Sequence, residues 1–245
     1  MSDQSPTVVL VHGAFADGSS WNGVITRLHD KGIRVIAPAN PLRGISIDSA
    51  YTASVFEQTP GPVLAVGHSY GGAVITNAAS DASDVVGLVY VAAFAPEDGE
   101  RLGEAAAASK DSILGTARVP HNYPSVDGGT AVEFTVDPAK IHEVFAADLP
   151  DELTPLLAAT QRPVAELAFT EPCGPPAWRH LPSWAVVALS DKAAGTDVVR
   201  SMAERAGATI TEVEGSHVIM ISQPDAVTDV ILTALAAIEA AAPVG

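Results

Sequence analysis

The 245-residue chain contains a single cysteine, Cys173. One cysteine cannot form an internal disulfide and cannot supply a cysteine-based metal site. The sequence also has no cluster of metal-ligating residues and no glycine-rich loop of the kind that cradles phosphates. We therefore expect no disulfide, no metal and no cofactor.

Positive charge is also scarce. Lysine and arginine number 13 against 29 aspartates and glutamates, which leaves a net charge of −16. Without a basic cluster to neutralise phosphates, binding to nucleic acid or to an anionic membrane is not expected. An acidic surface usually serves solubility, so it identifies no partner and no oligomeric state. A small molecule remains the expected ligand.

Long hydrophobic runs are missing too, although 47% of the residues are hydrophobic. No run reaches the length of a membrane span. Residues 1–6 are polar and lead straight into a predicted strand, which is not the pattern of a signal peptide. Aromatic residues make up only 5% of the chain, which indicates an aliphatic core. We expect a cytoplasmic protein.

Apolar segments of strand length alternate with segments of helical length. This rhythm predicts an α/β fold, with a mostly parallel sheet of about six strands and helices on both faces. The predicted strands are residues 7–12, 34–39, 63–66, 85–94, 183–189 and 208–213. The predicted helices of this part are residues 21–30, 47–58, 73–80, 196–206 and 223–242.

The rhythm breaks between residues 96 and 181. This segment leaves the sheet directly after the strand that follows residues 63–80, and it is too long for an ordinary loop. We interpret it as a largely helical cap over the site, with residues 1–95 and 182–245 forming the core. Its expected parts are helices over 99–110, 138–147 and 151–169, a loop around 121–129 and a possible short strand over 131–136.

A glycine-flanked serine stands between a predicted buried strand and a predicted helix. The residues Gly67-His68-Ser69-Tyr70-Gly71 fit the pattern G-x-S-x-G. In that strand–turn–helix context the serine sits on a sharp turn, so its neighbours must be very small. The pattern predicts that Ser69 is a nucleophile.

A serine hydroxyl needs a base to remove its proton, and the base needs an acid to orient it. Asp191 follows one predicted strand and His217 follows the last one, so both lie at the same edge of the sheet as Ser69. The order Ser, Asp, His is the one found on this type of fold. We predict that His217 is the base and Asp191 the orienting acid.

Other residues could compete for these roles. Three histidines lie in the inserted segment (His121, His142 and His180), and His29 lies on the surface of a predicted helix. His12 and His68 flank the motifs, where they are expected to hold loops by hydrogen bonds. Asp197 suits a helix start. Glu97 and Asp98, which follow a different strand, remain an alternative position for the acid.

Attack of a serine on an acyl carbon places negative charge on the carbonyl oxygen, which needs prepared N–H donors. The backbone N–H of Tyr70, directly after the nucleophile, is one expected donor. The second is expected from the loop after the first strand, His12-Gly13-Ala14-Phe15, and we assign it to Ala14. Phe15 and Met220 are expected to line the substrate pocket.

Three motifs in this order resemble the α/β-hydrolase superfamily over essentially the whole chain. They are the His12–Phe15 loop, the segment from Gly67 to Gly72, and Asp191 with His217. Within the superfamily, the sequence is most similar to small esterases related to plant methylesterases and hydroxynitrile lyases. The resemblance implies a cofactor-free Ser-His-Asp hydrolase with a helical cap. The loop from Phe15 to Trp21 departs from the plant pattern.

The predicted activity is hydrolysis of carboxylic esters of small to medium, largely apolar substrates through an acyl-enzyme on Ser69. A serine nucleophile argues against dehalogenases and epoxide hydrolases of this fold, which use a carboxylate. A lyase or C–C bond hydrolase on the same triad, or a receptor that keeps the triad without turnover, remains an alternative. The resemblance implies that lyases carry a lysine directly after the catalytic histidine and a threonine after the first strand. Here these positions hold Val218 and Ala14.

Overall fold

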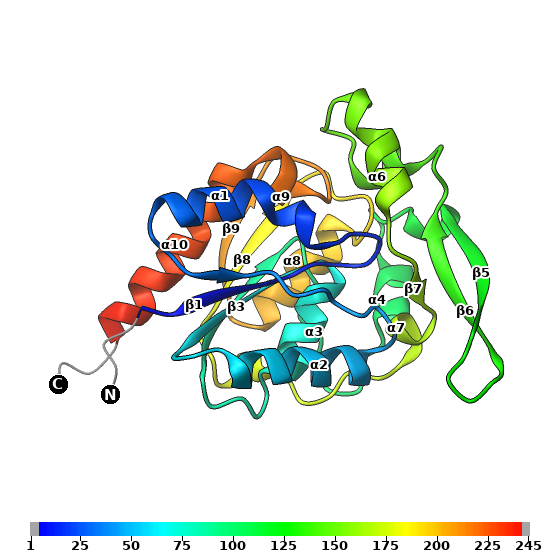
Figure 1. Ribbon diagram of the computed structural model, residues 1–245. Helices are drawn as coiled ribbons and strands as arrows, with labels where there is room; N and C mark the ends of the chain where they lie inside the picture. The colour runs from blue at the N-terminus through cyan, green and yellow to red at the C-terminus, as the bar shows by residue number, and fades with distance from the viewer. Residues whose placement is uncertain (1–4, 242–245) are drawn as a thin grey trace.

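The computed structural model describes residues 5–241. Its centre is a six-stranded, all-parallel sheet with the order β2-β1-β3-β4-β8-β9 (Figure 1). This confirms the predicted α/β class and the predicted sheet. The strands are β1 (Thr7–Val11), β2 (Val35–Ile36), β3 (Val63–His68), β4 (Val85–Val91), β8 (Ser183–Ala188) and β9 (Thr209–Val213).

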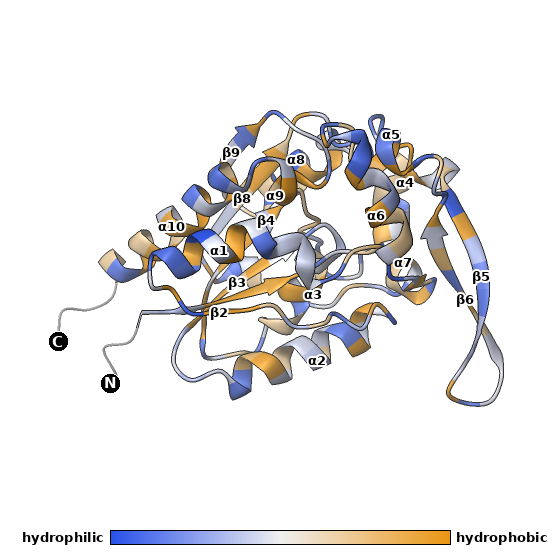
Figure 2. Ribbon diagram, turned by 45° about the horizontal axis from the view of Figure 1, so that its top comes forward, coloured by the Kyte–Doolittle hydropathy of each residue, from blue (hydrophilic) through white to orange (hydrophobic). Residues whose placement is uncertain are grey.

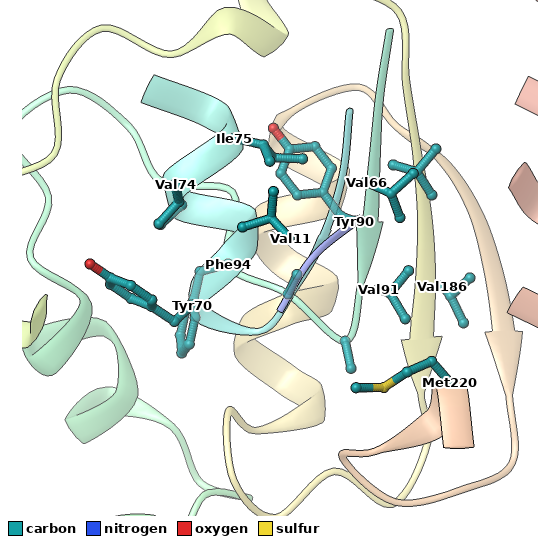
Figure 3. Packing of buried hydrophobic residues seen from close by; sticks show 14 of the residues in the cluster. Val11, Val66, Tyr70, Val74, Ile75, Tyr90, Val91, Phe94, Val186 and Met220 are labelled. Carbon is teal, nitrogen blue, oxygen red and sulfur yellow. The ribbon is translucent and has the colours of Figure 1, made fainter. Parts of the chain in front are cut away.

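The inner strands are apolar because the sheet is covered on both faces. All residues of β1 and β3 are buried, and Val9 pairs with Ala65 in their shared register. Val91 and Val186, which pair in register on the neighbouring strands β4 and β8, lie side by side in the core (Figure 3). In contrast, the edge strand β2 shrinks to two residues of the predicted 34–39, because it pairs on one side only.

Helices cover both faces of the sheet. In Figure 1, α1 and α10 lie together on one side, whereas α2 and α3 lie on the other. The helices and short helical turns of this part are η1 (Gly18–Trp21), α1 (Asn22–Asp30), α2 (Ile45–Gln58), α3 (Tyr70–Ala78), α8 (Thr196–Arg205), α9 (Ile219–Ser222) and α10 (Pro224–Ala241). The last residue of the predicted helix 223–242 lies outside the described residues.

The segment between β4 and β8 contains a sheet that the sequence analysis does not predict. Three antiparallel strands, β5 (Arg118–Pro124), β6 (Thr130–Val136) and β7 (Val164–Ala165), form it in the order β5-β6-β7. The prediction of a loop around residues 121–129 is therefore wrong over β5. Two prolines make β5 look like a loop, but β5 is an edge strand, where a missing N–H is tolerated. Its hydrophilic stretches are blue in Figure 2.

The predicted helix over 151–169 is also wrong as a single element. Helix α6 ends at Thr160, and Pro163 precedes the short strand β7. Proline lacks an N–H and restricts the residue before it, so the helix cannot continue through this point. The remaining elements of the segment are α4 (Leu102–Ala108), η2 (Leu114–Thr116), α5 (Ile141–Phe145), η3 (Asp151–Leu153), α6 (Thr154–Thr160), α7 (Leu167–Thr170) and η4 (Ala177–Arg179).

Across residues 5–241, no helix combines the length and the apolar character needed to cross a membrane.

Candidate active site

Ser69 stands at the junction of β3 and α3, in a conformation that few non-glycine residues adopt. Its φ of 53° and ψ of −122° place it in a strained region of backbone space. The surrounding backbone holds it there: the Ser69 N–H donates to the carbonyl of Val91 at 3.2 Å, and its own carbonyl accepts from Phe94 at 3.2 Å. The side chain is thus presented at the carboxyl edge of the sheet.

Neighbouring glycines make this turn possible. A Cβ at Gly67 would lie 2.5 Å from the carbonyl oxygen of Gly71, and a Cβ at Gly71 would collide with the carbonyl oxygen of Val11. The loop after β1 comes equally close, because a Cβ at Gly13 would lie 2.7 Å from the Cβ of Ser69. Only glycine fits these three positions without a backbone shift.

His217 and Asp191 form a buried pair beside this turn. Nδ1 of His217 lies 2.8 Å from Oδ2 of Asp191, and both side chains are almost completely excluded from solvent. The other carboxylate oxygen of Asp191 accepts the backbone N–H groups of Ala193 and Ala194 at 2.9 and 3.0 Å. These two amides fix the carboxylate, and the carboxylate in turn orients the imidazole.

The alternative acids are engaged elsewhere. Glu97 pairs with Arg179 at 2.7 Å, and Asp98 is exposed. Asp197 stands at the start of α8, as expected, and accepts the backbone N–H of Lys110 at 2.9 Å. Asp191 is the one carboxylate among these that contacts His217.

His68 joins the serine turn to the histidine loop. Its Nε2–H donates to the backbone carbonyl of His217 at 3.0 Å, and the two imidazole rings are 4.7 Å apart. Burial and the nearby His217 lower the pKa of His68 well below its ordinary value, so the ring is neutral. The predicted role of His68 in holding a loop agrees with this contact.

His12 likewise holds a loop of the site by hydrogen bonds to backbone groups, in this case the loop after β1. Its Nδ1–H donates to the carbonyl of Gly13 at 2.9 Å, and its Nε2 accepts the N–H of Asn40 at 3.0 Å. Asn40 returns a hydrogen bond to the His12 carbonyl at 3.0 Å. Burial lowers the pKa of His12 to about 4. These contacts fix the end of β1, immediately before Ala14.

Tyr70, the residue after Ser69, is held by its side chain. The Tyr70 hydroxyl donates to Oδ2 of Asp48 at 2.7 Å, and Asp48 also accepts the backbone N–H of Arg43. Burial and the Asp48 carboxylate raise the pKa of Tyr70 well above its usual range, so it stays protonated. The first turn of α3 is therefore fixed against α2.

These groups meet in one small pocket, which we call the Ser69 pocket. Ser69, His217, Ala14, Tyr70 and Phe15 all line it, and its volume is about 20 Å³. Its other walls are apolar: Phe94, Leu102, Ala106, Leu114, Phe145, Phe169, Ala193 and Ala194. Met220 is placed elsewhere: it is fully buried near Val91 and Val186 (Figure 3) and lines neither this pocket nor the cavity next to it.

The segment between β4 and β8 adds contacts that the sequence analysis missed. The ring of Phe145 lies 4.9 Å from the ring of His217. Three residues further on, Asp148 accepts a hydrogen bond from the hydroxyl of Ser216, the residue before His217. Local sequence carries no signal for these contacts, because they join residues about seventy positions apart.

The chemistry available at the site is that of a serine hydroxyl, an imidazole and a carboxylate. Within the part of the chain that the structure describes, no group of three or more histidine, cysteine, aspartate or glutamate side chains could hold a metal ion. Cys173 is buried, and burial raises the pKa of its thiol to about 12, which leaves it protonated and unreactive.

A comparison with models of known protein families identifies the family of this chain. A model of the alpha/beta hydrolase family matches residues 8–230. Since the match spans most of the sequence, the chain belongs to the alpha/beta hydrolase family. The resemblance drawn from the motifs is thereby confirmed.

One individual relative matches part of the chain. A carbendazim-hydrolyzing esterase from Nocardioides sp. (strain SG-4G) is 35% identical over 107 residues, which is 38% of this chain and 44% of that protein. The match therefore spans less than half the length of that relative.

Solved structures support the fold over nearly the full length. Polyneuridine aldehyde esterase has a TM-score of 0.80 at 19% identity, covering 94% of this chain and 99% of that one. A pyrethroid hydrolase from Sphingobium faniae JZ-2 has a TM-score of 0.76 at 21% identity, covering 95% and 98%. A methylesterase from Arabidopsis has a TM-score of 0.76 at 18% identity, covering 94% and 99%. At these identities the likeness concerns the fold alone.

Proposed function

We propose that this protein is a serine hydrolase that cleaves carboxylic esters through an acyl-enzyme on Ser69. The observation that carries the proposal is the buried His217–Asp191 pair, which shares one pocket with a serine on a strained, glycine-flanked turn. That combination has no structural necessity, whereas nucleophilic catalysis by a serine needs an activating base and typically a third group that orients the base.

The proton path follows from the hydrogen bonds. Because Nδ1 of His217 faces the Asp191 carboxylate, Nδ1 carries the proton and Nε2 is free to act as the base. Nε2 takes the proton of Ser69 as its oxygen attacks the ester carbon, and then passes it to the departing alcohol. A water molecule, activated in the same way, releases the acid and restores the serine.

The negative charge of each tetrahedral intermediate needs N–H donors. The backbone N–H groups of Ala14 and Tyr70 are the proposed donors, and both residues line the Ser69 pocket. Contacts of His12 and of the Tyr70 side chain hold the two segments in advance, so little reorganisation is needed during the reaction. Each such donor typically contributes a factor of about 10²–10³ in kcat.

An apolar, uncharged ester is the proposed substrate class. The walls of the Ser69 pocket are hydrophobic, and the net charge of −16 disfavours anionic molecules. The names of the relatives, an esterase and hydrolases of small molecules, agree with this class. Residues 96–181 act as the cap in this proposal, no cofactor takes part, and the protein is cytoplasmic.

The assignment of Asp191 as the orienting acid is tested by comparing kcat after replacement of each of two aspartates. Asp191→Asn should lower kcat for p-nitrophenyl acetate by about 10⁴, because an amide leaves His217 in the wrong tautomer. Asp197→Asn is the matched control and should change kcat little, because its carboxylate accepts from the Ser109 hydroxyl and the Lys110 N–H and does not contact His217. Equal losses in the two variants, or a larger loss in Asp197→Asn, would contradict the assignment.

A further inference from the structure

The Ser69 pocket is too small to hold an ester by itself. Its volume of about 20 Å³ is on the scale of one water molecule. A second cavity of about 120 Å³ lies next to it, between the core loop after β1 and the segment that carries α5 and α6. An apolar cavity of about 150 Å³ binds benzene, so this one suits a single ring or a short chain. We call it the cap-side cavity.

One aromatic pair separates the two spaces. Phe15 and Phe145 line both of them, and their rings meet edge to face with centroids 6.3 Å apart. Phe15 comes from the core and has a φ of 61°, a conformation that costs a bulky residue strain. Phe145 comes from α5. A turn of the Phe145 side chain, or a small shift of α5, would join the two spaces.

The cap-side cavity offers an apolar surface. Its aliphatic walls are Val136, Ile141 and Leu157 on one side and Val218 and Ile221 on the other. No lysine or arginine stands among the residues that line it, so nothing there would balance a negative charge.

Three of the polar side chains in its lining already have partners within the chain. The amide of Gln161 bonds both the N–H and the carbonyl of Val136, at 2.7 and 3.0 Å. The hydroxyl of Ser20 donates to the Asp17 carbonyl at 2.7 Å, and that of Thr160 donates to its own helix. The one charged side chain in the lining is Asp17, whose Oδ1 accepts the N–H of Ser19 at 2.7 Å. An uncharged occupant therefore gains mainly by contact with the aliphatic walls.

The position of His217 decides whether the acyl end or the alcohol end of the ester enters the cap-side cavity. His217 must reach the oxygen of the departing alcohol to give it a proton. Two residues that line the cavity, Val218 and Ile221, come one and four positions after this histidine, and Phe145 lies against its ring. The alcohol therefore extends past His217 toward the cap-side cavity. The acyl end stays in the Ser69 pocket, where Leu102 and Leu114 are among the walls and the small volume restricts the acyl group to one about as small as acetyl.

We propose that the cap-side cavity binds the alcohol part of the ester, and that this part is an uncharged apolar group about the size of a benzene ring. The proposal rests on the function proposed above and deepens it. It makes the substrate a short-chain acyl ester of an aromatic or similarly sized aliphatic alcohol. The Phe15–Phe145 pair separates when this group enters.

The test fills the cap-side cavity with a larger side chain and compares kcat/KM for two acetate esters. Leu157 lines the cavity, whereas Leu156 beside it is 60% exposed and does not. Leu157→Trp should lower kcat/KM for benzyl acetate about tenfold or more, and change that for ethyl acetate less than about threefold. Leu156→Trp, the matched control, should leave both esters near wild type. Thr160→Trp, at an exposed position lining the same cavity, is a second filling variant in case Leu157→Trp fails to fold.

Binding of benzyl alcohol separates this proposal from the proposed function. In the Ser69→Ala background, which needs no turnover, ligand-observed NMR should detect benzyl alcohol bound, and Leu157→Trp should abolish the signal. If wild type cleaves neither acetate, the proposed function fails while this binding still reports on the cavity. Equal effects on both acetates, equal effects of the two tryptophans, or a selective loss on ethyl phenylacetate in place of benzyl acetate would overturn the proposal.

Discussion

At the scale of single residues, two buried histidines fix the backbone around the site without taking part in the chemistry. His12 and His68 are both fully buried, and each uses a ring N–H to bind a backbone carbonyl next to a catalytic candidate. A charged imidazole is disfavoured at either position, because burial lowers the pKa of both rings and outweighs the attraction of Asp17 for His12. The site therefore depends on these rings remaining neutral.

This neutrality makes the stability of the fold depend on pH. The unfolded chain binds a proton at each histidine below a pKa of about 6.5, whereas His12 in the folded chain does so only near pH 4. Between these values the unfolded state holds more protons, so the free energy of unfolding falls as the pH falls. From pH 7 to pH 5, His12 alone should account for about 2 kcal/mol of this loss.

Urea unfolding at pH 7, 6 and 5 measures this loss. His12→Gln should be less stable than wild type at pH 7, yet lose about 2 kcal/mol less between pH 7 and pH 5. His29 is exposed on α1, so His29→Gln should keep the pH dependence of wild type. Identical pH dependence in all three proteins would show that His12 is not the buried neutral group described here.

At the scale of elements, the segment from α5 to Asp148 ties the chain between β4 and β8 to the loop that carries His217. Phe145 contacts the ring of His217, while the Phe145 carbonyl and the Asp148 carboxylate both accept from the hydroxyl of Ser216. Asp148 lines neither the Ser69 pocket nor the cap-side cavity. Its effect on catalysis should therefore pass through the position of His217.

Removing the Asp148 carboxylate should lower kcat while leaving KM nearly unchanged. We expect Asp148→Ala to reduce kcat for p-nitrophenyl acetate by about 10- to 100-fold, because a small displacement of the base is costly. Asp148→Asn keeps an oxygen that can accept from Ser216 and should recover most of the loss. Asp151→Ala, at an exposed position nearby, is the control. A rise in KM at constant kcat would instead indicate a role in substrate binding.

The same elements show what the sequence could predict. The pattern around Ser69 is local, and Asp191 and His217 each follow an apolar strand, so their meeting at one sheet edge could be expected. Phe145 and Asp148 could not be found this way, because their contacts depend on how the segment between β4 and β8 folds back. The prediction of one helix over 151–169 is wrong for a related reason: it follows the aliphatic pattern of this segment, whereas α6 ends at Thr160, before Pro163.

At the scale of the whole molecule, the arrangement favours hydrolysis over cyanide-releasing lyase chemistry. The position after His217 is Val218, a buried apolar side chain that cannot stabilise a departing anion. Lys192, next to Asp191 in sequence, is exposed and does not line the Ser69 pocket. Ala14 offers only its backbone N–H, which suits an oxyanion. The apolar walls of both cavities fit an uncharged ester.

The central claim is that Ser69 becomes covalently acylated, and a fluorophosphonate probe followed by intact-mass spectrometry tests it most directly. The probe forms a stable bond to a serine activated by a neighbouring base, so it reads the nucleophile without assuming a substrate. Wild type should gain one label and lose its esterase activity in parallel, while Ser69→Ala should gain none and remain folded. Labelling that persists in Ser69→Ala, or a wild-type protein that stays unlabelled, would contradict the account.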